Sequence, residues 1–116
     1  MPINIYYHNP RCSKSRQGLA LLKENNVIFE IKEYLNEGFT SKELVNIFRL
    51  LDQKPIDVVR KKEAIYKEVI TDPASMNQSD WVRAILENPS LIERPILVTN
   101  KGAKIGRPPE DLLKII

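Results

Sequence analysis

The sequence predicts an α/β fold in a single domain that spans residues 1–116. Two patterns predict it. A β-prone run, an amphipathic helix and an alternating run follow one another within about thirty residues, which is typical of a strand–helix–strand unit. After a helical middle section, a Val/Ile/Leu run and a Gly-containing turn predict a closing β-hairpin. The expected order is therefore strand, helix, strand, several helices, two strands and a final helix.

The first third of the chain carries the strand–helix–strand unit. Residues 3–7 are β-prone and end at the turn signal Asn9-Pro10. Ser13–Glu24 has a helical apolar stripe, and Asn25-Asn26 is a suitable stop because Asn tolerates the left-handed conformation at a helix end. Residues 27–34 alternate, so we expect a strand with one wet face that runs parallel to the first strand. The residues expected on its apolar face are Val27, Phe29 and Ile31.

The rest of the chain predicts helices, a hairpin and a last helix. Residues 40–43 form a capping-box pattern, and the helix behind it is expected to bury Leu44, Val45, Ile47, Phe48 and Leu51. Between Pro55 and Pro89 the pattern is helical but interrupted, and its strongest piece is Ser79–Glu87. Residues 95–106 predict the hairpin, and Pro108 suits the first turn of a C-terminal helix.

Composition excludes several classes of protein. With 42% hydrophobic residues the chain can bury a core of its own, but no apolar run approaches the roughly 18 residues of a membrane span. The net charge is +3, and its cations are dispersed among carboxylates, which argues against a nucleic-acid-binding face. The first ten residues lack the pattern of a signal peptide, so we expect a cytoplasmic protein. One cysteine and one histidine make a poor metal site, so no metal or bound cofactor is expected.

The single cysteine, Cys12, lies where the first strand gives way to the first helix. Unpaired backbone N–H groups at a helix N-terminus favour a thiolate, as do the cationic or basic side chains of the same turn, which are His8, Arg11, Lys14 and Arg16. An inert buried cysteine is the alternative, but the turn is too polar for an apolar pocket. We therefore predict that Cys12 is a nucleophile. Ser13 and Ser15 suit N-cap positions, and Ser15 is also a candidate hydrogen-bond donor to the thiolate.

A helix N-terminus also suits an anion, so a nucleophile placed there implies an oxyanion substrate. Such a substrate needs more cations than one turn provides. Arg94 precedes a proline at the start of a predicted strand, Arg107 follows the hairpin, and Arg60 lies in the interrupted helical region. Each arginine taken alone is more typical of a solvated side chain. Together they form a candidate oxyanion site.

Four motifs, taken together, are similar to the glutaredoxin-coupled arsenate reductase family. They are HNPRCSKSR (8–16), IDVVRK (56–61), NPSLIERPI (88–96) and GRP (106–108), in the family's order and across essentially the whole chain. The resemblance implies a thioredoxin-like fold, with a central mixed four-stranded sheet flanked by helices and a helical insertion before the closing hairpin. Many members continue past the last helix, whereas this chain stops at Ile116, so the resemblance is to the short arsenate-reductase-related branch.

The resemblance also implies roles for individual residues and partners. Cys12 would attack the arsenic of arsenate or a similar oxyanion, and His8 and Ser15 would help to hold it as a thiolate. The residues expected to bind the oxyanion and stabilise its charge are Arg60, Arg94 and Arg107. Glutathione would act as co-substrate, and glutaredoxin would resolve the mixed disulfide. The thioredoxin-like fold further implies a cis peptide bond between Arg94 and Pro95.

Two other functions remain open at this point. One is a general glutathione-dependent thiol oxidoreductase. The other is a redox-responsive regulator that binds a protein partner, since a related branch binds RNA polymerase and usually carries C-x-x-C. Ser15 stands where that branch has its second cysteine, which argues against a dithiol switch but not against partner binding.

Overall fold

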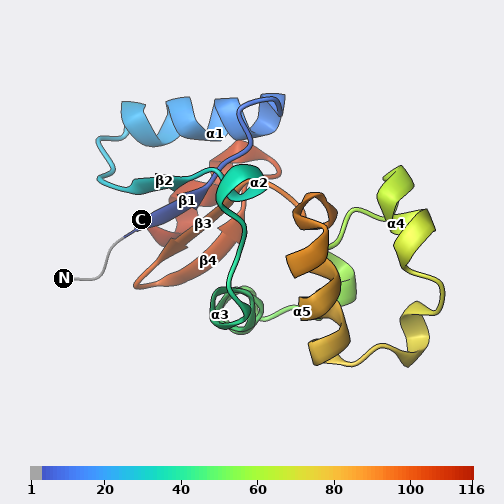
Figure 1. Cartoon of the computed structure of the whole chain (residues 1–116). Helices are drawn as coiled ribbons and strands as arrows, with labels where there is room; N and C mark the ends of the chain where they lie inside the picture. Colours follow the sequence, from blue (N-terminus) through green and yellow to red (C-terminus); the bar gives the residue numbers. More distant parts are fainter. Residues whose placement is uncertain (1–3) are drawn as a thin grey trace. The chain divides into compact units, whose positions relative to one another are not determined.

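The computed structural model describes residues 4–116 and contains the predicted succession of strands and helices (Figure 1). Residue 3, which was expected to begin the first strand, lies outside the described residues. The helices and strands are β1 (Ile5–Tyr7), α1 (Ser13–Glu24), β2 (Glu30–Lys32), α2 (Tyr34–Glu37), α3 (Ser41–Leu51), α4 (Ala64–Val69), α5 (Gln78–Glu87), β3 (Ile96–Thr99) and β4 (Gly102–Ile105). Short 3₁₀ helices occupy Pro55–Val58, Pro73–Ser75, Pro89–Leu91 and Pro109–Ile115.

The contacts within the chain group it into two compact units. Met1–Glu37 and Arg94–Ile116 form the first unit, which contains all four strands, α1, α2 and the C-terminal 3₁₀ helix. Gly38–Glu93 forms the second unit, which contains α3, α4 and α5. From residue 4 to residue 116, no helix combines the length and the apolar character needed to cross a bilayer.

The sheet has the strand order β2-β1-β3-β4, and it is mixed, as predicted. β1 and β2 run parallel, whereas β3 is antiparallel to both β1 and β4. Ile96 at the start of β3 pairs with Tyr7 at the end of β1 and with Ile105 at the end of β4. The residues just after β1, just before β3 and just after β4 therefore lie together, at the end of the sheet where β1 and β4 finish and β3 begins.

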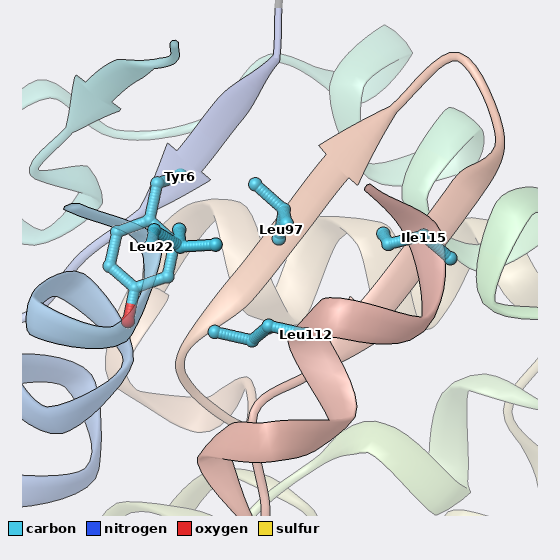
Figure 2. Close-up of a cluster of buried hydrophobic side chains, with 5 residues drawn as sticks. All are labelled: Tyr6, Leu22, Leu97, Leu112 and Ile115. Atoms are coloured by element: carbon cyan, nitrogen blue, oxygen red, sulfur yellow. The ribbon is translucent and has the colours of Figure 1, made fainter. Parts of the chain in front are cut away.

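The core of the first unit lies between the sheet, α1 and the C-terminal 3₁₀ helix. Figure 2 shows its buried side chains, which are Tyr6, Leu22, Leu97, Leu112 and Ile115. Val27 and Phe29 pack against this cluster, but they precede β2, because the predicted strand over residues 27–34 is only Glu30–Lys32 in the structure and Tyr34 begins α2. Ile31 was expected beside them, but it is 45% exposed. It belongs to β2, an edge strand, where a side chain has a neighbouring strand on one side only.

α1 begins and ends where the sequence predicts, but its N-cap differs. Cys12 itself is the N-cap residue, with extended backbone angles, so neither Ser13 nor Ser15 has that position. At the other end Asn25 is the C-cap and Asn26 has a φ of 56°, in agreement with the expected Asn-Asn stop. The reactive residue and the helix start are therefore the same residue.

The helices of the second unit follow their capping signals. The Thr40–Glu43 capping box is present, since Glu43 N donates to Thr40 Oγ1 at 3.1 Å and Thr40 N donates to Glu43 Oε1 at 2.9 Å. Val45, expected in the buried face of α3, is 42% exposed. α5 starts one residue earlier than predicted, because Asn77 and Asp80 form a second capping box.

The last predicted helix is a 3₁₀ helix, Pro109–Ile115, and Pro109 rather than Pro108 occupies its first turn. Pro108 is the N-cap residue in extended conformation. Leu112 and Ile115 are both buried, because the i and i+3 positions of a 3₁₀ helix lie on one face. This short element thus covers the sheet beside α1.

Gly18 marks the closest approach of α1 to the core. A Cβ there would overlap the Tyr6 hydroxyl and lie 2.9 Å from Leu112 Cδ1. Gly18→Ala should gain about 1 kcal/mol of helix propensity but lose about 1–3 kcal/mol through overpacking. We therefore expect a lower urea midpoint for Gly18→Ala, whereas Gln17→Ala on the exposed face should unfold at or above the parent midpoint. A Gly18→Ala protein more stable than the parent would contradict the tight contact.

Candidate active site

The loop between β1 and α1 holds Cys12 at the edge of the sheet. The backbone N–H of Cys12 donates to Asn9 O at 3.0 Å, and the N–H of Arg16 donates to Cys12 O at 3.0 Å as the first bond of α1. The side chain of Arg16 braces the same loop, since its Nη1 donates to Pro10 O at 2.8 Å. Cys12 is a free thiol and is half-buried. Its sulfur is therefore held in place but accessible.

Two arginines reach this loop from the closing hairpin. Arg107 Nη2 donates to Cys12 Sγ at 3.8 Å, and Arg107 Nε donates to Arg94 O at 2.8 Å. The register of β3 and β4 explains why the two arginines lie close together, because Arg94 precedes β3 by two residues and Arg107 follows β4 by two residues. The hairpin is further closed by a bond from Gly106 N to Pro95 O at 2.9 Å.

The Arg94–Pro95 peptide bond is cis, which confirms the sequence prediction, and the Arg107–Pro108 bond is cis as well. The Arg94 guanidinium lies near enough to Cys12 to hydrogen-bond its sulfur. Its Nε atom, however, is buried and has no hydrogen-bond partner among the described residues. A buried donor without a partner is unfavourable, so this N–H is available to an oxygen of a bound anion.

The pKa of Cys12 is lowered from its ordinary value. Burial alone would raise the pKa, but three groups that favour the thiolate outweigh it. The backbone N–H of Ser15 has the largest effect, followed by the guanidinium of Arg94 and the backbone N–H of Lys14. The predicted influence of the helix N-terminus is thus exerted by main-chain N–H groups of the first turn, even though the neutral sulfur makes no regular N-cap hydrogen bond.

The side chain of Ser15 forms hydrogen bonds with the loop that follows β1. Its hydroxyl, fully buried, accepts a hydrogen bond from Asn9 N at 2.9 Å and lies 2.7 Å from His8 Nδ1. Burial lowers the pKa of His8, and Arg16 and Lys23 lower it further against the opposing effect of Glu33, so the imidazole is neutral near pH 7. The tautomer of the neutral imidazole decides which of the two groups donates in this hydrogen bond.

The structure thus shows the hydrogen bonds that the His8 and Ser15 side chains make. Within residues 4–116 neither side chain forms a hydrogen bond with the Cys12 sulfur, and both contribute to hydrogen bonds that connect the β1–α1 loop to the first turn of α1. Their roles in holding the thiolate stay a prediction, and the structure offers an indirect route through the loop.

Tyr6 is a supporting residue that the sequence did not reveal. Its hydroxyl is buried and donates to Ser15 O at 2.7 Å, and burial raises the pKa of this phenol far above its ordinary value. The ring also lies 5.6 Å from that of His8, centroid to centroid. Tyr6 and Tyr7 are both buried in β1, and no local signal in the sequence indicated the hydrogen-bond partner of Tyr6. It anchors the first turn of α1, whose N–H groups act on Cys12.

Arg60, the third predicted arginine, belongs to the second unit. There its guanidinium forms an ion pair with Glu63, and its backbone N–H donates to Leu91 O at 2.7 Å beside the Val59–Ile92 bridge. Its participation in a site with Cys12 stays a prediction.

The arrangement suits nucleophilic chemistry on an anion. A thiolate-prone sulfur, two guanidinium groups and the N-terminus of α1 lie at one edge of the sheet. Within the described part of the chain, His, Cys, Asp and Glu residues form no cluster of three or more that could hold a metal ion. The groups present can polarise an oxyanion by themselves.

Comparisons with known proteins show the family and the fold of the chain. The sequence model of the ArsC family matches residues 7–115. The chain is 41% identical to an arsenate reductase of Haemophilus influenzae, over 97% of each protein, and 43% identical to the uncharacterized Escherichia coli protein YfgD, over 95% of this chain and 93% of that protein. It superposes on a solved arsenate reductase from Vibrio cholerae with a TM-score of 0.93 and 37% identity, over 99% and 98% of the two chains. The thioredoxin-like fold predicted from the sequence is confirmed.

Substitutions can separate the side chain of Ser15 from its backbone. Ser15→Ala removes a buried hydroxyl and should lower the free energy of unfolding by about 1–3 kcal/mol. It keeps the backbone N–H, so the pKa of Cys12, followed by its ultraviolet thiolate absorbance, should rise less than in Arg94→Ala. The Gln17→Ala protein serves as the control. A larger rise for Ser15→Ala than for Arg94→Ala would mean that the hydroxyl, and not the arginine, holds the thiolate.

Proposed function

This chain belongs to the ArsC family, and we propose that it is an oxidoreductase that reduces arsenate, or a similar oxyanion, with glutathione and glutaredoxin as its thiol partners. One observation carries the proposal most directly: Arg107 donates to the sulfur of Cys12 while the Nε of Arg94 beside it has no partner in the described residues. Two guanidinium groups beside one nucleophile suit a compact anion whose charge is spread over several oxygens.

The first step is attack of the Cys12 thiolate on arsenic. One hydroxyl of the oxyanion takes up a proton and leaves as water, and a sulfur–arsenic bond forms. Charge grows on the remaining oxygens during the attack, and planar guanidinium forks match such oxygens in pairs. Arg94 and Arg107 would stabilise that charge. The main-chain N–H groups lower the pKa of Cys12 and thereby increase the fraction of the residue that is present as the reactive thiolate.

The electrons come from two external thiols. Glutathione displaces a further hydroxyl as water, so that arsenic(V) carries the sulfurs of both Cys12 and glutathione. A glutaredoxin thiolate then attacks the glutathione sulfur, a mixed disulfide forms between these two, and the electron pair of the broken arsenic–sulfur bond stays on arsenic. Arsenic(V) becomes arsenic(III), and water releases arsenite from Cys12. A chain with a single cysteine needs its resolving thiol from outside.

Arg60 would be a third cation for the oxyanion, as the sequence motifs predict. Its guanidinium is paired with Glu63 within the second unit. A carboxylate partner keeps an arginine ordered, and the remaining N–H donors of the fork can still bind an anion.

The proposed activity is tested by a coupled assay with arsenate, glutathione, glutaredoxin, glutathione reductase and NADPH. We expect NADPH consumption that requires arsenate, glutaredoxin and this protein together, and no activity for Cys12→Ser. Consumption that is independent of arsenate but proceeds with a glutathionylated disulfide substrate would favour a general thiol oxidoreductase instead. No turnover with either substrate would contradict both enzymatic functions and favour a partner-binding role.

The arginines provide a second test. Arg94→Ala and Arg107→Ala should each lower turnover of arsenate on the order of 100-fold, as expected for lost charge stabilisation. Alkylation of Cys12 by iodoacetamide, measured at a pH where the thiol is fully ionised, should change far less. Sulfate or phosphate should slow this alkylation in the parent protein but not in the two variants.

The control for both measurements is Lys101→Ala. Lys101 lies in the β3–β4 turn, at the opposite edge of the sheet, so this variant should behave as the parent. Full arsenate turnover in both arginine variants, with alkylation indifferent to the anions, would rule out an oxyanion site at Cys12.

A further inference from the structure

A cavity of about 300 Å³ opens beside the Cys12 loop, on the β2 side of the first unit. One wall is the loop that follows β1, and the other is the segment that follows β2. They meet because β1 and β2 are parallel neighbours and the His8 N–H extends their pairing with a bond of 2.9 Å to Lys32 O. The lining residues are His8, Asn9, Pro10, Arg11, Glu33, Leu35 and Asn36. Crevices at the carboxyl ends of strands commonly bind ligands in open α/β sheets.

The two walls carry opposite charges. Arg11 stands on the first wall and Glu33 on the second, and in the part of the chain that the structure describes neither side chain has an ion-pair partner. The Asn9 side chain is oriented by its Oδ1, which accepts from Arg11 N at 3.0 Å. Asn36 Nδ2 contacts Glu33 Oε1 at 3.4 Å, which is a weak bond. The cavity is thus lined by one cationic side chain, one anionic side chain and two amide side chains, and Arg11 and Glu33 do not form an ion pair with each other.

Such a lining matches a small zwitterion. A carboxylate would accept hydrogen bonds from Arg11, an ammonium would donate to Glu33, and the amides would satisfy the remaining polar atoms. The volume is at the lower end of the range for small-ligand sites, which suits a headgroup of amino-acid size rather than an extended peptide. A fully anionic ligand such as arsenate would be repelled by Glu33, so this cavity is distinct in chemistry from the arginine site.

We propose that this cavity binds the γ-glutamyl end of glutathione, whose ammonium and carboxylate groups share one carbon. The inference rests on the proposed function, since it gives the thiol co-substrate a place on the protein. The residues assigned to recognition are Arg11 for the carboxylate and Glu33 for the ammonium.

The sulfur of a ligand bound in this way can reach the reacting atoms. A tripeptide spans at most about 10 Å when extended, and the thiol lies near its middle. Arg11 is the residue next to Cys12, so a short reach from the cavity brings the thiol to the arsenic on Cys12. The arginines approach Cys12 from the β3–β4 side, and the cavity lies on the β2 side, with β1 between them. Oxyanion and thiol would therefore not compete for the same space.

Binding is tested without any reaction by titrating the full chain with S-methylglutathione, which has no free thiol, and following backbone amide resonances. We expect saturable shifts in residues 8–11 and 33–36. Arg11→Gln and Glu33→Gln should each weaken binding about tenfold, as expected for one lost hydrogen bond to a charged group. Two charge-matched controls should bind as the parent does. Lys101→Gln, in the β3–β4 turn, is the control for Arg11→Gln. Glu24→Gln, at the C-terminal end of α1, is the control for Glu33→Gln.

Kinetics give a second readout that a structural effect would not reproduce. Arg11→Gln and Glu33→Gln should raise the KM for glutathione about tenfold and leave kcat nearly unchanged. With 2-mercaptoethanol, which has no charged groups to recognise, in place of glutathione, the change in KM between each variant and the parent should be much smaller than the change for glutathione. A parallel loss with both thiols would show general damage to the site and overturn the assignment.

The outcomes separate this inference from the proposed function. If S-methylglutathione binds at the cavity but arsenate is not reduced, the co-substrate site stands and the arsenate proposal fails. If arsenate is reduced but S-methylglutathione shifts no resonance in residues 8–11 or 33–36, the inference alone fails. If the two substitutions change only the KM for glutaredoxin, the cavity serves the protein partner and the inference is overturned.

Discussion

The pairing of β3 between β1 and β4 is the constraint on which the site depends. Ile96 pairs with Tyr7 on one side and with Ile105 on the other, and this register fixes which residues leave the sheet at the same edge. Cys12 and Arg107 are 95 residues apart in sequence, yet they are brought into hydrogen-bonding distance. Ile96 and Leu97 are both buried on opposite faces of β3, so a slip of one residue would exchange the side chains packed on the two faces and disturb the core.

Burial and charge act in opposite directions on the nucleophile, and the fold decides the balance. Half-burial of Cys12 disfavours the thiolate, but main-chain N–H groups of α1 and the Arg94 guanidinium overcome it. These N–H groups act only if the first turn of α1 is held in place. The buried bond from Tyr6 to Ser15 O, and the Ser15 hydroxyl between His8 and Asn9, hold it there. The apolar core and the reactivity of the thiol are thus connected through a few buried polar contacts.

Local signals were sufficient for most of the fold. The bounds of α1, the Asn25–Asn26 stop and the capping box at Thr40 depend on neighbours within one or two turns, and all were predicted. The exposure of Ile31 depends on strand order, which a single alternating run does not contain. In the site, sequence patterns predicted Cys12 and the arginines, and the structure places Arg94 and Arg107 beside Cys12. Those patterns could not predict the partner of the Ser15 hydroxyl, because that partner depends on the three-dimensional path of the β1–α1 loop.

The strand order also bears on how two substrates and one thiolate can meet. In the order β2-β1-β3-β4, the Cys12 loop follows an inner strand, so each side of the loop faces a different neighbour. The β3–β4 side supplies Arg94 and Arg107, which are suited to an anion, and the β2 side supplies a cavity with one charge of each sign. A thiol that attacks arsenic held by Cys12 must approach where the arginines do not already enclose the oxygens. A nucleophile that follows an edge strand has a neighbouring strand on one side only. The inner position of β1 gives Cys12 a neighbouring strand on each side, one for the oxyanion and one for the thiol.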